Sequence, residues 1–171
     1  MLLAIYAALS LICIIACYKL GDWKNWRLYY PTILFFMFGE ILFDVLVYES
    51  HLWCYYAPGM SDKLIDLIWV FAIFPSTVLI YLYRMPEKLP KKVLYIAFWI
   101  ALYVGIELFL HYTGHMIYCN GWGIHWSILL DTVVFIALYL HHKKPLLGWA
   151  VSTPFFIAVL FIFGINPFKC Q

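Results

Sequence analysis

Five carboxylate side chains lie inside long apolar stretches of the sequence, where a charge is costly. They are Glu40, Asp44, Asp66, Glu107 and Asp131, and the stretches that carry them contain no Lys or Arg. Each costs roughly 2.5 kcal/mol or more near the middle of a membrane, so such residues usually face the interior of a helix bundle and carry function. Protons, histidines, a cation or strong hydrogen bonds must offset their charge. The first hypothesis is that they bind or pass a proton, a cation or a small cationic ligand.

Three histidines, His111, His115 and His125, indicate a second chemistry near the same carboxylates. Glu107, His111 and His115 are spaced four residues apart, and that spacing places side chains on one helix face. Carboxylates and imidazoles on facing helices build metal sites in helix bundles, and zinc needs three or four such ligands. The second hypothesis is a membrane-embedded, metal-assisted lipid hydrolase. These histidines and Asp66 or Glu107 would hold a divalent metal, and another carboxylate would act as general base.

A third hypothesis assigns the carboxylates no ligand. The chain has 14 Tyr and 8 Trp, whose hydroxyl and indole groups can satisfy buried acids and fix the packing of neighbouring helices. The protein would then be structural or act through interactions with other proteins. The hypotheses differ in whether the carboxylates converge on one cavity or each contact a separate partner. Asp62, just before the third apolar stretch, is interpreted as a solvated residue.

The elements that position these groups belong to a very apolar chain. Of its 171 residues, 66% are hydrophobic and 12% charged, against about 45–50% and about 25% in soluble domains. Six apolar blocks are each about long enough to span the roughly 30 Å hydrocarbon layer as helices. With no basic run and no phosphate-binding glycine loop, the expected partner is the lipid bilayer and not nucleic acid. The prediction is an all-α, polytopic membrane protein, a single domain over residues 1–171, with spans at about 2–20, 28–48, 64–83, 93–112, 122–140 and 146–165.

Lysine and arginine are distributed unevenly between the connectors of these six spans. The positive-inside rule places the basic connectors in the cytoplasm, and therefore the other connectors and both termini outside. At a rise of about 1.5 Å per residue, all five carboxylates then fall in the outer half of the bundle. Nine of the 11 basic residues lie in the first, third and fifth connectors: Lys19, Lys24, Arg27, Arg84, Lys88, Lys91, Lys92, Lys143 and Lys144.

The cysteines divide by their position in this topology. Cys13 and Cys17 lie in the first span and are interpreted as small apolar packing residues. Cys54 and Cys119 fall in the two outer connectors, where an oxidising exterior permits a disulfide bond between them. Spacing in the sequence does not fix the geometry that the bond needs, so their pairing stays open.

Several sequence stretches occur together in one order: Tyr29–Phe36, Leu64–Leu67 followed by Phe74–Thr77, Asn120–Trp122 running into His125–Ser127, and Leu140–Pro145. In this order they resemble an uncharacterised family of small multi-pass membrane proteins of spore-forming bacilli and clostridia, over most of the chain from about residue 28 to 150. The resemblance implies a bacterial plasma membrane. That family has no established activity, so the resemblance transfers no catalytic residues.

Overall fold

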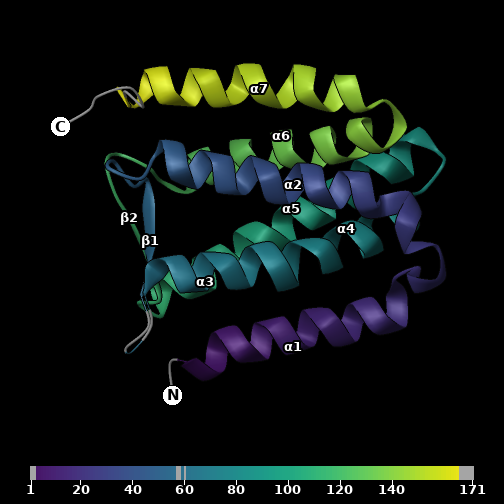
Figure 1. The fold of residues 1–171 in the computed structure, drawn as a ribbon, viewed down its shortest axis with the longest axis horizontal. Coiled ribbons are helices and arrows are strands. Elements are labelled where there is room, and N and C mark those ends of the chain that lie inside the picture. Colours follow the sequence, from purple (N-terminus) through teal and green to yellow (C-terminus); the bar gives the residue numbers. More distant parts are fainter. Residues whose placement is uncertain (1–2, 57–58, 60, 166–171) are drawn as a thin grey trace.

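The computed structural model describes residues 3–56, 59 and 61–165, and it is built almost entirely of helices that run side by side (Figure 1). Apolar runs of this length form helices because a bilayer offers no other partner to the backbone polar groups. In chain order the elements are α1 (Leu3–Leu20), a 3-10 turn (Trp23–Asn25), α2 (Trp26–Leu46), β1 (Trp53–Tyr55), α3 (Asp62–Ile68), a π-helical turn (Trp69–Ile73), α4 (Phe74–Tyr83), α5 (Leu89–Tyr112), β2 (Met116–Tyr118), α6 (Ile124–Lys143) and α7 (Pro145–Ile162).

Five helical stretches are long and apolar enough to cross a membrane. They are Trp23–Leu46, Asp62–Tyr83, Leu89–Tyr112, Ile124–Lys143 and Pro145–Ile162. The first helix is apolar as well but shorter, with Ile5–Leu20 as its apolar part. Large apolar side chains such as Leu94, Leu146 and Phe161 are exposed on the outside of the bundle, where lipid would contact them. The structure therefore supports the prediction of a transmembrane helical protein.

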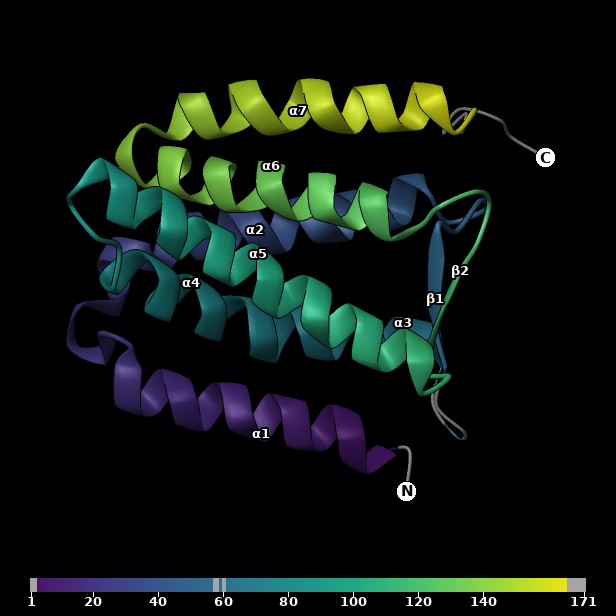
Figure 2. The same cartoon turned by 180° about the vertical axis from the view of Figure 1, so that it is seen from behind.

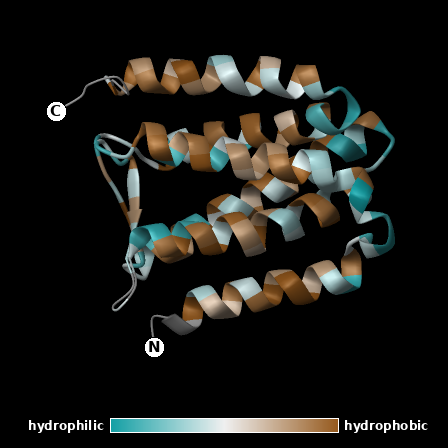
Figure 3. Cartoon of the chain, viewed as in Figure 1, coloured by the Kyte–Doolittle hydropathy of each residue, from teal (hydrophilic) through white to brown (hydrophobic). Residues whose placement is uncertain are grey.

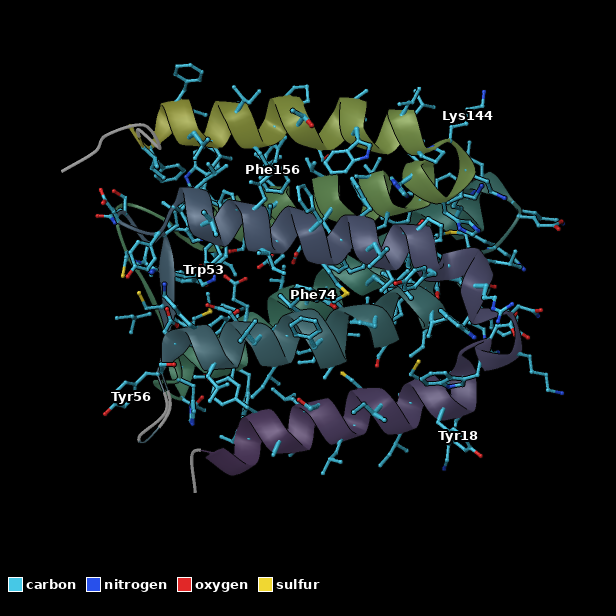
Figure 4. All side chains as sticks on the ribbon, in the orientation of Figure 1. Tyr18, Trp53, Tyr56, Phe74, Lys144 and Phe156 are labelled. Atoms are coloured by element: carbon cyan, nitrogen blue, oxygen red, sulfur yellow. The ribbon has the colours of Figure 1, made fainter. Side chains whose placement is uncertain are left out.

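The helices alternate in direction, so the connectors gather at the two ends of the bundle (Figures 1 and 2). One end, here called the basic end, holds the α1–α2, α4–α5 and α6–α7 connectors with their Lys and Arg residues; its hydrophilic colouring is clear in Figure 3. The strand end holds both strands, the start of α1 and the end of α7. Tyr18 and Lys144 lie at the basic end, and Trp53 and Tyr56 at the strand end (Figure 4).

The helix from α3 to α4 is interrupted by the π-helical turn that begins at Trp69. Pro75 follows in the first turn of α4, where proline lacks an N–H donor and its ring crowds the carbonyl four residues earlier. The Ser76 hydroxyl donates a hydrogen bond to the Ala72 carbonyl oxygen, 2.8 Å away. π-Helical turns occur often at functional sites. Trp69 and Phe74, at either end of this one, are both buried.

The two connectors at the strand end pair as a small antiparallel sheet, which the sequence analysis does not predict. Trp53 lies opposite Tyr118, and Tyr55 lies opposite Met116. Helix α5 stops just before Gly114, whose φ of 75° is in the left-handed region that glycine adopts without strain. This turn directs the chain from α5 into β2. Strands of three residues are too short for an alternating pattern to stand out in the sequence.

Toward the basic end, the bundle is filled by a core of large apolar side chains. Val78 and Tyr81 of α4, together with Phe135 and Leu138 of α6, have 0% of their surface exposed. The Tyr81 hydroxyl donates to the Phe135 carbonyl oxygen, 2.7 Å away, which satisfies a polar group that no water reaches. These four side chains thus fill the space between α4 and α6 toward the basic end.

Candidate functional site

Glu40 of α2 lies where three cavities meet, and it lines each of them. The largest, about 260 Å³, lies between α2, α3 and β1 and is called the acidic cavity. A groove of about 140 Å³ between α2, α6 and α7 is called the apolar groove. A pocket of about 80 Å³ between α2, α5 and α6 is called the central pocket. A single carboxylate therefore links all three spaces.

Two pairs of carboxylates line the acidic cavity. Glu40 and Asp44 are one turn apart on α2, and Asp62 and Asp66 are one turn apart on α3, because residues four apart share a helix face. Three of the five predicted carboxylates thus share one cavity, and Asp62, interpreted from the sequence as solvated, joins them. The rest of the wall consists of Ile41, Phe43, Val47, His51, Leu52, Trp53, Lys63, Leu67, Val70 and Phe71.

Lys63 supplies the basic side chain in the wall of the acidic cavity. Its ammonium nitrogen lies 3.5 Å from the centroid of the Tyr48 ring, an arrangement in which the negative face of the ring attracts the cation. The neighbouring Asp62 accepts a hydrogen bond from the Tyr55 backbone N–H, which joins the start of α3 to β1. The positive charge of Lys63 is thus held at the cavity wall by an aromatic ring.

Glu107 and Asp131 meet Glu40 in the central pocket. Glu107 Oε1 accepts a hydrogen bond from the Tyr118 hydroxyl, 2.6 Å away, and another from the Ser127 hydroxyl, 2.5 Å away. Hydrogen bonds to an ionised acceptor are among the strongest in proteins. Glu107 is therefore held in place by β2 and α6. The remaining wall is largely aromatic and consists of Phe36, Trp53, Tyr55, Trp69, Phe74, Tyr103, Leu110, Met116, Leu130 and Val134.

The other four predicted carboxylates lack such partners. The side-chain oxygens of Glu40, Asp44, Asp66 and Asp131 make no hydrogen bond to another of the residues that the structure describes, whereas each residue lines the acidic cavity or the central pocket. Burying an unpaired polar or charged group is costly. Glu107 behaves as the structural hypothesis expects, but the other four face shared space, as the binding hypothesis expects.

The three histidines proposed as metal ligands have separate surroundings. His111 stacks on the Tyr118 ring at 4.5 Å between centroids. His115 is buried, and its Nδ1 lies 2.8 Å from the Thr113 hydroxyl oxygen, whereas His125 is exposed. Across residues 3–56, 59 and 61–165, no group of three or more His, Cys, Asp or Glu side chains is arranged to hold a metal ion. The predicted metal site is not assembled, because these histidines lie on α5, in the turn after it and on α6 with no common focus.

Two tyrosines of the strands keep their hydroxyl protons. Burial raises the pKa of Tyr55 well above its usual value, and the nearby carboxylates of Asp66, Glu40 and Glu107 add to this effect. Burial also raises the pKa of Tyr118, as do its hydrogen bond to Glu107 and the charge of that carboxylate. Near neutral pH both rings therefore stay uncharged, so Tyr118 remains a hydrogen-bond donor to Glu107.

Trp53 is a site residue that the sequence analysis missed. It lines both the acidic cavity and the central pocket, and its ring lies 5.8 Å from that of Phe43 and 5.2 Å from that of Trp122. Its place in the sequence does not mark it, because tryptophan is common at membrane boundaries. Its position over the acids follows from the strand pairing, which leaves no clear pattern in the sequence.

Cys54 and Cys119 lie close together at the strand end. Their sulfur atoms are 4.0 Å apart, so the two cysteines whose pairing the sequence leaves open are close enough to interact. Cys13 and Cys17 lie in α1, half-buried and buried respectively, which agrees with the interpretation of both as packing residues.

No family model, no curated protein and no solved structure matches this chain. The resemblance to membrane proteins of spore formers therefore stays a prediction from sequence, and the chemistry of the acidic cavity is the guide to function.

Proposed function

We propose that this chain is a six-span protein of a bacterial plasma membrane, with both termini outside, that binds a small organic cation in the acidic cavity. One observation carries the proposal: carboxylates from three helices, free of partners among the described residues, line cavities that meet at Glu40. A bound cation would offset their charge at the place where the fold leaves room for it.

In the proposed topology α1 also crosses the membrane, which adds a sixth span to the five longer apolar stretches. Helix α1 packs against α4 and the π-helical turn, and Tyr6 is 1% exposed. The Tyr6 hydroxyl donates to the His115 carbonyl oxygen, 2.8 Å away, so α1 is fastened to the strand end of the bundle. With the basic connectors at the opposite end, the positive-inside rule favours an external strand end.

The walls of the acidic cavity favour an organic ammonium group over a metal ion. Hard metal ions need several oxygen ligands directed at one point, and no such group occurs among the described residues. The cavity instead combines four carboxylates with apolar and aromatic surface, including Phe43, Trp53 and Phe71. An alkylammonium ion suits this mixture because its charge pairs with carboxylates while its methyl groups contact aromatic rings.

The packing of the bundle supports binding in preference to passage. A path between α4 and α6 to the basic end would have to cross the core that contains Val78, Tyr81, Phe135 and Leu138. The half-buried carboxylates all lie on the strand side of this core. We therefore propose a site that is entered and left from the outer side.

Titration calorimetry of the purified full chain with tetramethylammonium chloride tests the proposal. We expect binding that Glu40→Gln and Asp66→Asn each weaken at least tenfold. Tert-butyl alcohol, which is uncharged and of similar shape, should not bind measurably. Glu49→Gln is the matched control, because Glu49 is exposed and does not line the cavity.

The proposal fails if tetramethylammonium binds the unmodified chain and all three variants with the same affinity. It also fails if the cation binds none of them although the variants melt at the same temperature as the unmodified chain. Sodium chloride at the same ionic strength separates a specific effect of the ammonium ion from screening of surface charges.

A further inference from the structure

Cys54 and Cys119 occupy one face of the two-stranded sheet. Cys54 in β1 lies opposite Ile117 in β2, and residues two apart on a strand share a face, so Cys119 is its diagonal neighbour. The Cys119 N–H donates to the Leu52 carbonyl oxygen, 2.8 Å away, which extends the pairing past β2. With the register fixed, the sulfur atoms are 4.0 Å apart. A disulfide bond requires them to come to about 2 Å.

We propose that Cys54 and Cys119 form a disulfide bond on the outer side of the membrane, and that this bond holds the strand pair closed over the carboxylates. The inference rests on the external strand end of the proposed function, because disulfides form and persist in oxidising compartments. It does not depend on the identity of the bound cation.

The strand pair forms the roof of the site. Trp53, next to Cys54, lines both the acidic cavity and the central pocket, and Tyr55 and Met116 line the central pocket. Tyr118, next to Cys119, donates to Glu107. The proposed bond therefore joins the neighbours of Trp53 and Tyr118, two of the roof residues that contact the site, and breaking it removes the covalent restraint between β1 and β2.

Bond formation requires an oxidant, for which an external thiol–disulfide exchange protein in its disulfide form suffices. Burial and the neighbouring Cys119 sulfur raise the pKa of the Cys54 thiol, which disfavours Cys54 as the first nucleophile. The Cys119 thiolate attacks one sulfur of the oxidant and gives a mixed disulfide. Cys54 then attacks Cys119 Sγ and releases the second oxidant sulfur. Two thiols are oxidised, the oxidant becomes a dithiol, and the two protons pass to its sulfur atoms.

The experiment counts thiols in the full chain in a Cys170→Ser background, because Cys170 lies outside the described residues and would complicate the count. Intact cells are treated with or without the membrane-impermeant reductant TCEP, then denatured in acid and alkylated with maleimide-polyethylene glycol. Of the four remaining cysteines, we expect two to react without TCEP, namely Cys13 and Cys17, and all four to react after it. Cys54→Ser is the control, with three reactive thiols in both conditions.

Four reactive thiols without TCEP would overturn the proposed bond. Two reactive thiols that become four only when TCEP is added after lysis would mean that the bond exists but that the strand end is not external, which contradicts the topology of the proposed function.

Hydrogen exchange of the purified protein tests the role of the bond in the roof. The Tyr56 N–H donates to the His115 carbonyl oxygen, 2.8 Å away, and the Cys119 N–H donates across the same strand pair. We expect both amides to exchange at least tenfold faster after reduction, while amides in the middle of α6 are unchanged. Equal rates in the oxidised and reduced proteins would show that the bond does not hold the roof closed.

Discussion

Glu40 and Glu107 are both glutamates on long apolar helices, yet their carboxylates have different surroundings. Glu107 accepts hydrogen bonds from Tyr118 and Ser127, whereas Glu40 faces three cavities and has no hydrogen-bond partner within the described ranges. A carboxylate held by hydrogen bonds contributes to the fold, and one left for a ligand costs stability until the ligand arrives. The two residues should therefore respond differently to the same substitution.

Replacing Glu107 with Gln is expected to destabilise the protein by about 1–3 kcal/mol, because it weakens two charge-assisted hydrogen bonds. Glu40→Gln should leave stability unchanged or raise it, since it removes an unpaired, half-buried charge. Thermal unfolding in one detergent, without any added cation, compares the two variants. A larger loss for Glu40→Gln than for Glu107→Gln would mean that Glu40 is a packing residue.

Replacing Lys63 with Gln is expected to strengthen tetramethylammonium binding about fivefold. Lys63 places a positive charge on the wall of the acidic cavity, where it repels a bound cation. Removal of this repulsion should improve the binding free energy by about 1 kcal/mol in a partly solvated site. Titration calorimetry at low salt measures the change. Lys91→Gln, at the basic end, should have no effect. A weakened affinity in Lys63→Gln would instead assign Lys63 a part in building the site.

At the residue scale, the sequence was enough to pick out all five carboxylates, because an acid within an apolar span stands out by its cost. It did not separate Glu107 from the others, because the partner Tyr118 comes from an unpredicted strand. It assigned Asp62 to solvent because this residue lies outside the apolar run. The spacing of the histidines did not reveal that His111, His115 and His125 have separate surroundings, because spacing along one helix does not say what lies on its neighbours.

At the scale of elements, the helices were predictable because each apolar run is long and uninterrupted. The fourth predicted span begins at residue 93, whereas α5 begins at Leu89. The sequence interpretation gave Lys91 and Lys92 to the connector, but long basic side chains can sit in the first turn of a helix and extend to the membrane surface. The π-helical turn and the two strands left no periodic signal, because both are only a few residues long.

The tight packing of α6 against α7 gives a test at this scale. A Cβ added at Gly148 would lie 2.5 Å from the Cβ of His141 and 2.9 Å from its Cα. Gly148→Ala must therefore push the two helices apart, at an expected cost of about 1–3 kcal/mol. Gly105→Ala in α5 is the matched control, since nothing lies within 4 Å of an added Cβ there. Thermal unfolding should separate the two variants; equal melting temperatures would mean that the α6–α7 contact is looser than the structure has it.

Across the whole molecule, charge and open space are divided between the two ends. The basic connectors lie at one end (Figure 3), and the acidic cavity, the central pocket and the strands lie toward the other. The core that includes Tyr81 and Phe135 lies between them. In the proposed topology the basic end would set the membrane orientation, and the proposed site lies toward the strand end. Composition predicted the membrane setting and the charge asymmetry, but the convergence of the acids depends on packing that the sequence pattern does not encode.

The same division predicts the accessibility of the chain in a cell. If α1 and the five longer apolar stretches all cross the membrane, epitope tags at the N- and C-termini of the chain are both cleaved by protease added to intact cells. A tag inserted after Glu87, in the α4–α5 connector, is protected until the membrane is opened. The N-terminal tag decides the count, because α1 is the shorter apolar helix. An N-terminal tag that stays protected while the C-terminal tag is cleaved would mean five spans, with α1 not crossing. In that case Tyr6 could not contact His115 at the strand end. We therefore expect the N-terminal tag to be cleaved as well.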